Sequence, residues 1–457
     1  MMQQTDELTI APEGLHDVTR RRKLRDYGAQ MAEKQRYFAG FQTNQQGEFD
    51  AQLRPLLEMN LLNLGDSDEA GAYQVNSKPF ERAVVDYYAR LWKMPSPYWG
   101  YLTAMGSTEG NMFGLWNARD FLCGAATMAW PALTRVRYAP VVLYSASSHY
   151  SIAKACRLLR LATPAEIGPM LGRCPLNNGI WPQALACDER GRIDVPALLQ
   201  LVTFFHRYRR PVIICLTCGT TFSGACDDWQ QISAWLGQNL PPNSAEQRSY
   251  WLHMDGALGA NYLSFWPEPE GRKLAIDGQL AALHSLCASP YKWLSMPWPC
   301  GVVMLDARYR TAAMESPHYI GSRDATLSGS RPGLSAVVLW NQLCRLGDAG
   351  QRSLIQQCYD MQRYLHQQLR FLFARLDPTQ TRLRLLPLLP GSLMVQFSAP
   401  NPTLIEQYSL SCEWVEVHGK RQRLCHVVVL PHCQRARLDS LVWALGRPGA
   451  FLPNEEV

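Results

Sequence analysis

Short apolar strands alternate with helical stretches between residues 61 and 310, and this alternation limits the fold more than any other feature of the chain. Pro140–Tyr144, Val212–Thr217 and Trp251–Asp255 are apolar runs of strand length, and each is followed by a turn rich in small or polar residues. Strands that alternate with helices form a mostly parallel sheet with helices packed against it. We therefore expect an α/β protein, in which the turns after the strands face a ligand-binding crevice.

The chain divides into three predicted regions, and its 457 residues are enough for two domains with a large core. Residues 1–60 are polar and predicted to be helical, and they form an arm or a cover. Residues 61–310 form the large α/β domain, and residues 311–457 form a smaller α+β domain. The smaller domain is predicted to contain the helices Gly333–Leu346, Ser353–Leu376 and Gln434–Leu445 and the strands Gly391–Phe397 and His426–Leu430.

Lys292 is the most informative single side chain. It lies in the run Leu283–Leu305, which contains no acid and no arginine. Burial of an ammonium group disfavours its charge and lowers its pKa, and a neutral amine can form a Schiff base with a carbonyl group. The alternative is a lysine whose stem packs in the protein while its tip reaches water.

Asp255 ends the predicted strand that begins at Trp251, and small residues follow it. A carboxylate at this position can pair with the protonated ring nitrogen of pyridoxal phosphate, which makes the ring an electron sink. Gly256, Ala257 and Gly259 would let a flat ring approach the backbone. The alternative is an aspartate that caps the next helix.

Three further turns carry candidate ligand-binding residues. Gly106, Ser107 and Thr108 precede the helical stretch Met112–Phe121, so they offer N–H groups and hydroxyls to a phosphate, or they cap a plain helix. His149 follows the strand Pro140–Tyr144, where an imidazole can stack on a ring or can simply be hydrogen bonded. A threonine-rich turn, Cys218–Asp228, follows the strand Val212–Thr217.

The order of these motifs resembles that of the pyridoxal-phosphate-dependent group II amino acid decarboxylases, in particular the branch of histidine decarboxylases and serine decarboxylases. The resemblance extends from about Leu62 to near Leu445. The matching strings are WGYLTAMGSTEGN (99–111), SSHYSIAKA (147–155), GTTFSGACDD (219–228), HMDGALGA (253–260), PWPCGVVM (297–304), YIGSRDATLSGSRPG (319–333) and HVVVLP (426–431).

The resemblance implies fold type I, the fold of aspartate aminotransferase, with pyridoxal 5′-phosphate as the cofactor. It implies that Lys292 binds the cofactor as a Schiff base, that Asp255 pairs with the ring nitrogen and that His149 stacks on the ring. Tyr319 lies in a segment that, in the family it resembles, can form a mobile loop near the substrate. The remaining implied roles are phosphate binding by Gly106, Ser107, Thr108 and Ser289 and lining of the ring by Thr221 and Ala257.

Two segments depart from the family pattern. Tyr291 precedes Lys292 where the family usually has histidine, and Pro332 and Leu334 replace the asparagine and the histidine of a Gly-Ser-Arg-Asn-Gly-His string. Both departures fall near the expected site, so the substrate stays open. The expected reaction is decarboxylation of an L-amino acid to its amine and CO₂, with Tyr319 or Lys292 returning the proton. The alternatives are transamination or aldehyde formation on the same scaffold, and a cofactor-binding protein without turnover.

Bulk properties agree with a globular enzyme that acts on a small-molecule amino acid. Hydrophobic residues make up 47% and charged residues 18% of the chain. The net charge of +6 comes with only one dense basic run, Arg20–Lys23, so we expect no nucleic-acid partner. No apolar run has membrane-span length, and the start MMQQTDELTI lacks the pattern of a secretion signal. We expect a cytoplasmic homodimer with reduced cysteines and no metal site.

Overall fold

The computed structural model describes residues 8–10, 12–123, 139–241, 248–280, 283–311, 315–379, 381–417 and 420–452. The first seven residues lie outside these ranges. They make up most of the segment from which we expect no secretion signal. None of the described helices combines the length and the apolar character needed to cross a bilayer.

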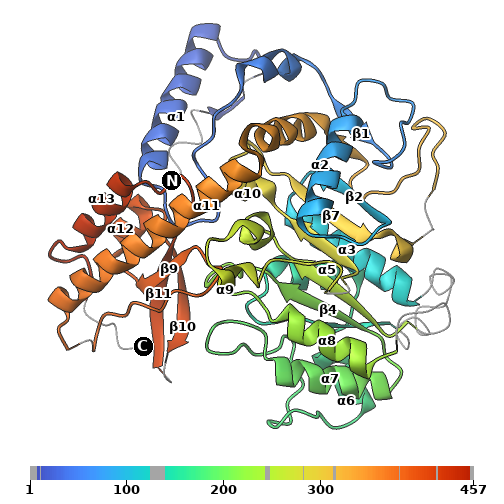
Figure 1. The fold of residues 1–457 in the computed structure, drawn as a ribbon. Helices are drawn as coiled ribbons and strands as arrows, with labels where there is room; N and C mark the ends of the chain where they lie inside the picture. The colour runs from blue at the N-terminus through green and yellow to red at the C-terminus, as the bar shows by residue number, and fades with distance from the viewer. Residues whose placement is uncertain are drawn as a thin grey trace.

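A six-stranded sheet forms the centre of the molecule, with the order β2-β7-β6-β5-β4-β3 (Figure 1). The strands β3, β4, β5 and β6 run parallel, and β7 runs antiparallel to both of its neighbours. The expected α/β class with a mostly parallel sheet is therefore confirmed. The strands are β2 (Tyr98–Thr103), β3 (Val141–Leu143), β4 (Val212–Thr217), β5 (Tyr250–Asp255), β6 (Ser285–Ala288) and β7 (Gly301–Asp306).

Both faces of this sheet are buried. Because successive side chains of a strand point to opposite faces, each strand contributes to two apolar clusters. In β4, Val212, Ile214 and Leu216 belong to one apolar cluster, and Ile213 and Cys215 belong to another on the opposite face. The first cluster includes residues of α2 (Lys78–Leu91), α7 (Val195–Arg207) and α8 (Trp229–Asn239), and the second includes residues of α3 (Ser107–Cys123) and α5 (Tyr150–Leu159). The continuous apolar strands follow from this double burial.

Helix α3 lies unusually close to the sheet because two glycines face it. A Cβ atom at Gly110 would lie 2.5 Å from the Cβ of Cys287 on β6, and one at Gly114 would lie 2.5 Å from Nδ1 of His253 on β5. Any larger residue would force the helix away from the strands. This close approach brings the side chains of α3 next to the ends of β5 and β6.

A second, three-stranded sheet lies at the other end of the molecule, with the antiparallel order β10-β11-β9. Its strands are β9 (Met394–Ser398), β10 (Ser411–Val417) and β11 (Lys420–Val428), and α13 (Arg435–Leu445) contributes to the same apolar cluster. Helix α11 (Gly333–Leu376) joins the two clusters, and the non-helical Gly347 separates the two helices that the sequence predicts. The domain boundaries at residues 60 and 310 stay a prediction.

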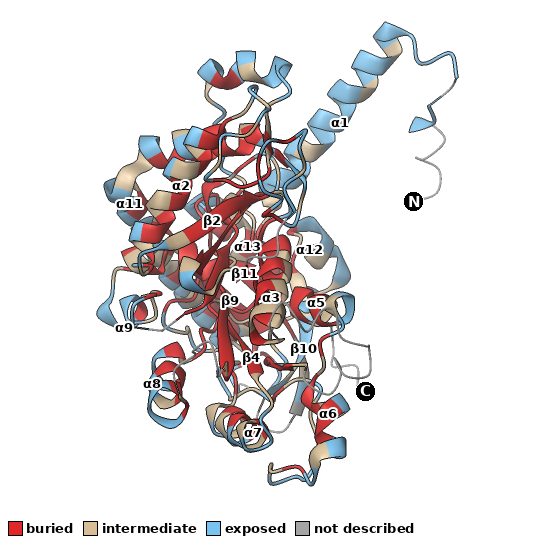
Figure 2. Ribbon diagram, turned by 90° about the vertical axis from the view of Figure 1, so that its right-hand side faces the viewer, coloured by how far each residue is buried: buried red, intermediate tan, exposed pale blue. Residues whose placement is uncertain are grey.

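The amino-terminal region is only partly helical. Helix α1 (Asp17–Tyr37) has no buried residue and projects away from the body (Figure 2). The stretch between α1 and the 3₁₀ helix Ala51–Glu58 forms no helix. It packs against the body of the protein, and Ala39, Gln42 and Asn44 are buried. A Cβ at Gly40 would lie 2.2 Å from the carbonyl oxygen of Ser409, which shows how tightly this stretch packs.

The remaining elements are short. They are β1 (Leu62–Leu64) paired with β8 (Ser330–Pro332), α6 (Pro164–Leu171), α9 (Pro269–Arg272), α10 (Pro290–Leu294), α12 (Pro402–Gln407) and the 3₁₀ helices Gly259–Asn261, Leu263–Phe265 and Ala307–Tyr309.

Candidate active site

The predicted site residues gather where β5 and β6 end. These strands are parallel, with Asp255 opposite Cys287, so the turns that follow them leave the sheet side by side. The N–H of Ser289 donates to the carbonyl oxygen of Ala257 (2.9 Å), which ties the two turns together. Lys292 lies on the short helix α10 immediately after β6.

The Lys292 ammonium group reaches a side chain of the amino-terminal stretch. Its Nζ donates to Oε1 of Gln42 (3.0 Å), and Nε2 of Gln42 donates to the carbonyl oxygen of Thr221 (3.2 Å). Burial lowers the pKa of Lys292, and the negative charge of Asp255 opposes that shift. A lysine in these surroundings yields its proton more readily than a solvated one, as covalent chemistry at an amine requires.

The Asp255 carboxylate is nearly fully buried and is held at both oxygens. Its Oδ1 accepts from the backbone N–H of Ala257 (3.1 Å), and its Oδ2 accepts from Nδ2 of Asn111 on α3 (2.8 Å). The first bond is the local turn contact that a capping role would give. The second bond, across 144 residues of sequence, is not required for capping and fixes the carboxylate within the site.

His149 caps the start of α5, where the N–H of Ser151 donates to its Nδ1 (3.2 Å). Burial lowers the pKa of His149, the positive charges of Lys292 and Lys154 add to the shift, and the negative charge of Asp255 opposes it. Nδ1 of His149 also bonds Oγ of Ser151 (2.8 Å), which accepts from the same Asn111 that donates to Asp255, so His149 and Asp255 share one site. The lowered pKa of His149 favours its neutral form.

The phosphate cradle expected at residues 106–108 lies beside Ser289. Helix α3 begins at Ser107, whose N–H donates to Oγ of Ser289 (2.8 Å), and that hydroxyl donates to Oγ of Ser107 (2.8 Å). Gly106 has a φ of +62°, and a Cβ there would lie 3.0 Å from Cε1 of Tyr291 and 3.1 Å from Oγ of Ser289. Thr108 follows, half-buried in the first turn. N–H groups and hydroxyls gathered at a helix N-terminus suit a phosphate.

The two departures from the family pattern have distinct surroundings. Tyr291 packs beside Gly106 at the cradle, and its burial raises the pKa of the phenol. Arg331, which precedes Pro332, is buried and pairs with Glu81 (3.0 Å). Tyr291 therefore borders the candidate phosphate site, whereas Arg331 on β8 bonds Glu81 on α2 and the carbonyl oxygen of Gly65 (2.9 Å).

Tyr319 is the one predicted catalytic residue that the structure does not bring to this cluster. Its side chain is 82% exposed. The following residues are anchored elsewhere, because the N–H of Ala72 donates to the carbonyl oxygen of Ile320 (2.7 Å) and Oγ of Ser322 donates to Glu69 (2.9 Å). Thr221 is also exposed, but its backbone contacts Gln42, which contacts Lys292.

Sequence reasoning missed three residues that the structure places in the site. Gln42 lies in a stretch that gave no motif, so no local signal identifies it. Asn111 and His253 lie inside the matching strings 99–111 and 253–260, close in sequence to predicted site residues, and this position was the available signal. Both side chains are buried in the structure. Nε2 of His253 bonds Oδ1 of Asn111 (2.9 Å), which connects both to Asp255.

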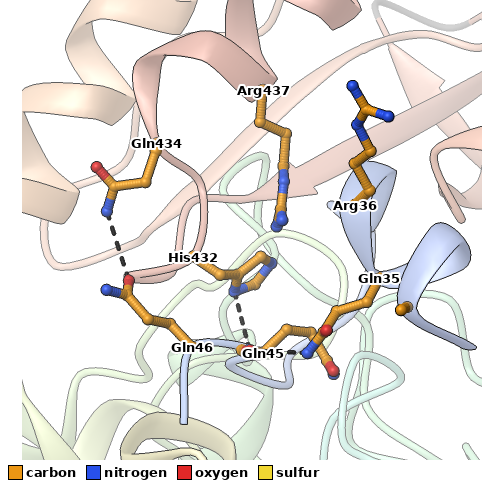
Figure 3. Close-up of a pocket in the computed structure, with 8 residues that line it drawn as sticks. Gln35, Arg36, Gln45, Gln46, His432, Gln434 and Arg437 are labelled. Atoms are coloured by element: carbon orange, nitrogen blue, oxygen red, sulfur yellow. Dashed lines mark hydrogen bonds between the residues drawn. The ribbon is translucent and has the colours of Figure 1, made fainter. Parts of the chain in front are cut away.

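A separate cavity of about 290 Å³ lies between α1 and the start of α13 (Figure 3). The N–H of Gln45 donates to Nδ1 of His432 there (3.2 Å), so the stretch that supplies Gln42 also borders this cavity. The described residues contain no group of three or more His, Cys, Asp or Glu side chains that could hold a metal ion. Neither observation adds a group to the site around Lys292.

The residues present fit pyridoxal phosphate. The cradle offers N–H and hydroxyl donors for a phosphate, Lys292 offers an amine of lowered pKa, and Asp255 offers a buried carboxylate. Gly106 leaves the space that a Cβ would fill. A sheet of this order with these groups at the ends of β5 and β6 defines a pyridoxal-phosphate-dependent enzyme of fold type I.

Comparison with known proteins agrees. The pyridoxal-dependent decarboxylase conserved domain matches residues 39–372, and the chain belongs to this family. Histidine decarboxylase of Solanum lycopersicum is 30% identical over 91% of this chain and 86% of its own, and serine decarboxylase 3 of Oryza sativa is 30% identical over 88% and 76%.

A structure of L-methionine decarboxylase from Streptomyces sp. 590 is 32% identical, with a TM-score of 0.85 over 97% of both chains. Glutamate decarboxylase of Lactobacillus brevis, at 17% identity and a TM-score of 0.72, shares the fold. The expected family, fold type, cofactor and reaction class are thus confirmed: the chain is a pyridoxal-phosphate-dependent amino acid decarboxylase.

Proposed function

We propose that the cluster around Lys292 is the active site and that its residues divide the work of decarboxylation among them. The observation that carries the proposal is the meeting of Lys292, Asp255 and Ser289 at the ends of β5 and β6. Lys292 attaches the cofactor, and Gly106, Ser107, Thr108 and Ser289 bind its phosphate. When bound, pyridoxal phosphate supplies a ring that accepts the electrons released as CO₂ leaves.

Each remaining residue serves by position and charge. Asp255 keeps a negative charge at the ring nitrogen, where two donors hold the carboxylate in one orientation. The neutral imidazole of His149 would stack on the ring, and Thr221 and Ala257 would line it. Gln42 accepts from Lys292 Nζ and so aims the amine into the site. The burial of Asp255 strengthens its interactions because water does not screen them.

We further propose that the working unit is a homodimer and that Tyr319 serves the site of the second copy. Tyr319 is exposed in a single chain and is anchored away from Lys292. Helix α1 buries no residue in the single chain, and Leu24 and Tyr27 are more than half exposed, so it presents apolar side chains for a partner. The proton that replaces CO₂ would then come from the phenol of Tyr319, with Lys292 as the alternative donor.

A mixed dimer tests this arrangement. We would co-express one chain with Lys292→Ala and a differently tagged chain with Tyr319→Phe, and purify the species that carries both tags. If Tyr319 acts on the second copy, one site in this dimer has both residues and about half of the normal activity returns. Activity no higher than that of Tyr319→Phe homodimers would place Tyr319 in its own chain's site or outside catalysis. Light scattering on the wild type would show whether a dimer exists.

Substrate identity follows from a direct screen. Purified enzyme with pyridoxal phosphate would be given each common amino acid, and CO₂ and the amine would be measured together. Histidine, serine and methionine come first because they are named for the related decarboxylases. An amine formed in equal amount to CO₂ supports the proposal, whereas a keto acid or an aldehyde as the main product would contradict it. We place the enzyme in the cytoplasm, because all fourteen cysteines are free thiols.

A further inference from the structure

Asn111 is a fully buried asparagine whose carboxamide makes four hydrogen bonds. Its Nδ2 donates to Oδ2 of Asp255 and to Oγ of Ser151, both at 2.8 Å. Its Oδ1 accepts from Nε2 of His253 (2.9 Å) and from Sγ of Cys287 (3.1 Å). An amide can make two bonds at each end, so every bond that Asn111 can form is used inside the protein.

The direction of each bond in this network is fixed from both ends. At one end, the indole N–H of Trp251, which can only donate, bonds Oγ of Ser285 (2.8 Å). Because Oδ1 of Asn111 can only accept, the proton of His253 lies on Nε2 (2.9 Å), and Nδ1 of His253 is left to accept from the Ser285 hydroxyl (2.7 Å). At the other end, Oδ2 of Asp255 accepts from Asn111, which requires the NH₂ group of Asn111 to face it.

The same logic sets the proton on His149. Because Oγ of Ser151 accepts from Asn111, its proton is directed to Nδ1 of His149 (2.8 Å). The backbone N–H of Ser151 also donates to this Nδ1 (3.2 Å), which agrees with an unprotonated nitrogen there. His149 therefore carries its proton on Nε2. One carboxamide thus governs both the carboxylate proposed for the ring nitrogen and the imidazole proposed to stack on the ring.

We propose that Asn111 is a positioning residue that holds Asp255 in one orientation and His149 in one tautomer, with Trp251, Ser285 and His253 locking the orientation of its amide. The inference rests on the roles proposed above for Asp255 and His149. The glycines on α3 permit it, since Gly110 and Gly114 allow the helix to approach β5 and β6 closely enough for these bonds.

An isosteric substitution tests the amide. Asn111→Asp replaces the donor that faces Asp255 by an oxygen, so two carboxyl groups meet with little change in shape. The charged groups that act on this site are Asp255 on β5, Lys292 on α10 and Lys154 on α5. A matched control is Asn117→Asp, a buried asparagine on the same helix whose Nδ2 donates to the carbonyl oxygen of Phe113 (3.1 Å).

The experiment follows the visible absorbance of the holoenzyme against pH, together with kcat and the thermal midpoint. Two carboxyl groups this close share one proton, so Asn111→Asp leaves only part of the negative charge of Asp255 for the ring nitrogen and should shift the titration midpoint of the bound cofactor by about one pH unit. Its kcat should fall at least tenfold, while the control moves only the thermal midpoint. A titration midpoint and a kcat in Asn111→Asp equal to those of the control would overturn the proposal.

Ser151→Ala separates the two branches, because it removes the link to His149 and keeps the bond from Asn111 to Asp255. It should lower kcat and leave the titration midpoint in place; an unchanged kcat would refute the His149 branch. If Asn111→Asp does not fold, Asn111→Ser should lower kcat at least tenfold relative to Asn117→Ser, and equal values would refute the proposal. A wild type that binds cofactor but decarboxylates no amino acid would instead refute the proposed function, since the absorbance titration needs no substrate.

Discussion

Gly106→Ala should weaken cofactor binding more than it weakens the fold. Gly106 has a φ of +62°, a conformation that costs a residue with a Cβ about 1–2 kcal/mol. The new Cβ would also press on Oγ of Ser289 at 3.1 Å and Cε1 of Tyr291 at 3.0 Å. Moving Ser289 breaks its bond from the N–H of Ser107 and displaces one proposed phosphate ligand.

The size of the effect follows from that lost ligand. A hydrogen bond to a charged group contributes about 1.5–3 kcal/mol, so the dissociation constant for pyridoxal phosphate should rise roughly 10- to 100-fold. Apo-enzyme would be titrated with the cofactor and its absorbance recorded, beside a thermal melt. Gly237→Ala is the control, because Gly237 lies on α8 with no atom within 4 Å of the added Cβ. Wild-type affinity in Gly106→Ala would show that the cradle does not bind the phosphate.

Two further predictions use other parts of the chain. Asp255→Asn keeps the shape of the side chain and removes its charge, so kcat should fall about 10²-fold or more while the cofactor still binds. Turnover measures the first effect and cofactor absorbance the second. Near-normal turnover would show that the ring works without this carboxylate. Burial lowers the pKa of His253 to about 4 and those of His284 and His432 to about 3, so the unfolded chain binds protons below pH 6.5 that the folded chain does not. The free energy of unfolding should therefore fall as the pH drops from about 6.5 to 4, by at most about 1.4 kcal/mol per pH unit for each histidine. In urea titrations, His432→Gln should make this pH dependence less steep. An unchanged slope of unfolding free energy against pH would refute the assignment to His432.

The fold was predictable because its signals are local. The strand Val212–Thr217 was identified to the residue, and the strands around residues 141 and 251 were placed within a residue or two. A short, continuous apolar run that ends in a polar turn is typical of a strand that is buried on both faces of a sheet. The same turns carry Lys292, Asp255 and His149, so their meeting at one edge followed from the parallel topology.

Long-range contacts were not predictable in the same way. Gln42 reaches Lys292 from a stretch without regular structure, and no pattern in residues 38–50 marks it. The role of Asn111 depends on how closely α3 packs on the sheet, which two glycines decide. The position of Tyr319 depends on contacts of its neighbours with Glu69 and Ala72, far away in sequence. Such residues become visible only after the chain is folded.

The most direct test of the account is to locate the lysine that carries the cofactor. Holoenzyme would be reduced with borohydride, digested, and searched by mass spectrometry for the peptide that bears the cofactor. The account predicts one modified peptide, with the label on Lys292, and no label in the Lys292→Ala variant. A stoichiometric label on another lysine, such as Lys154 or Lys78, or a wild type that takes up no label, would contradict it.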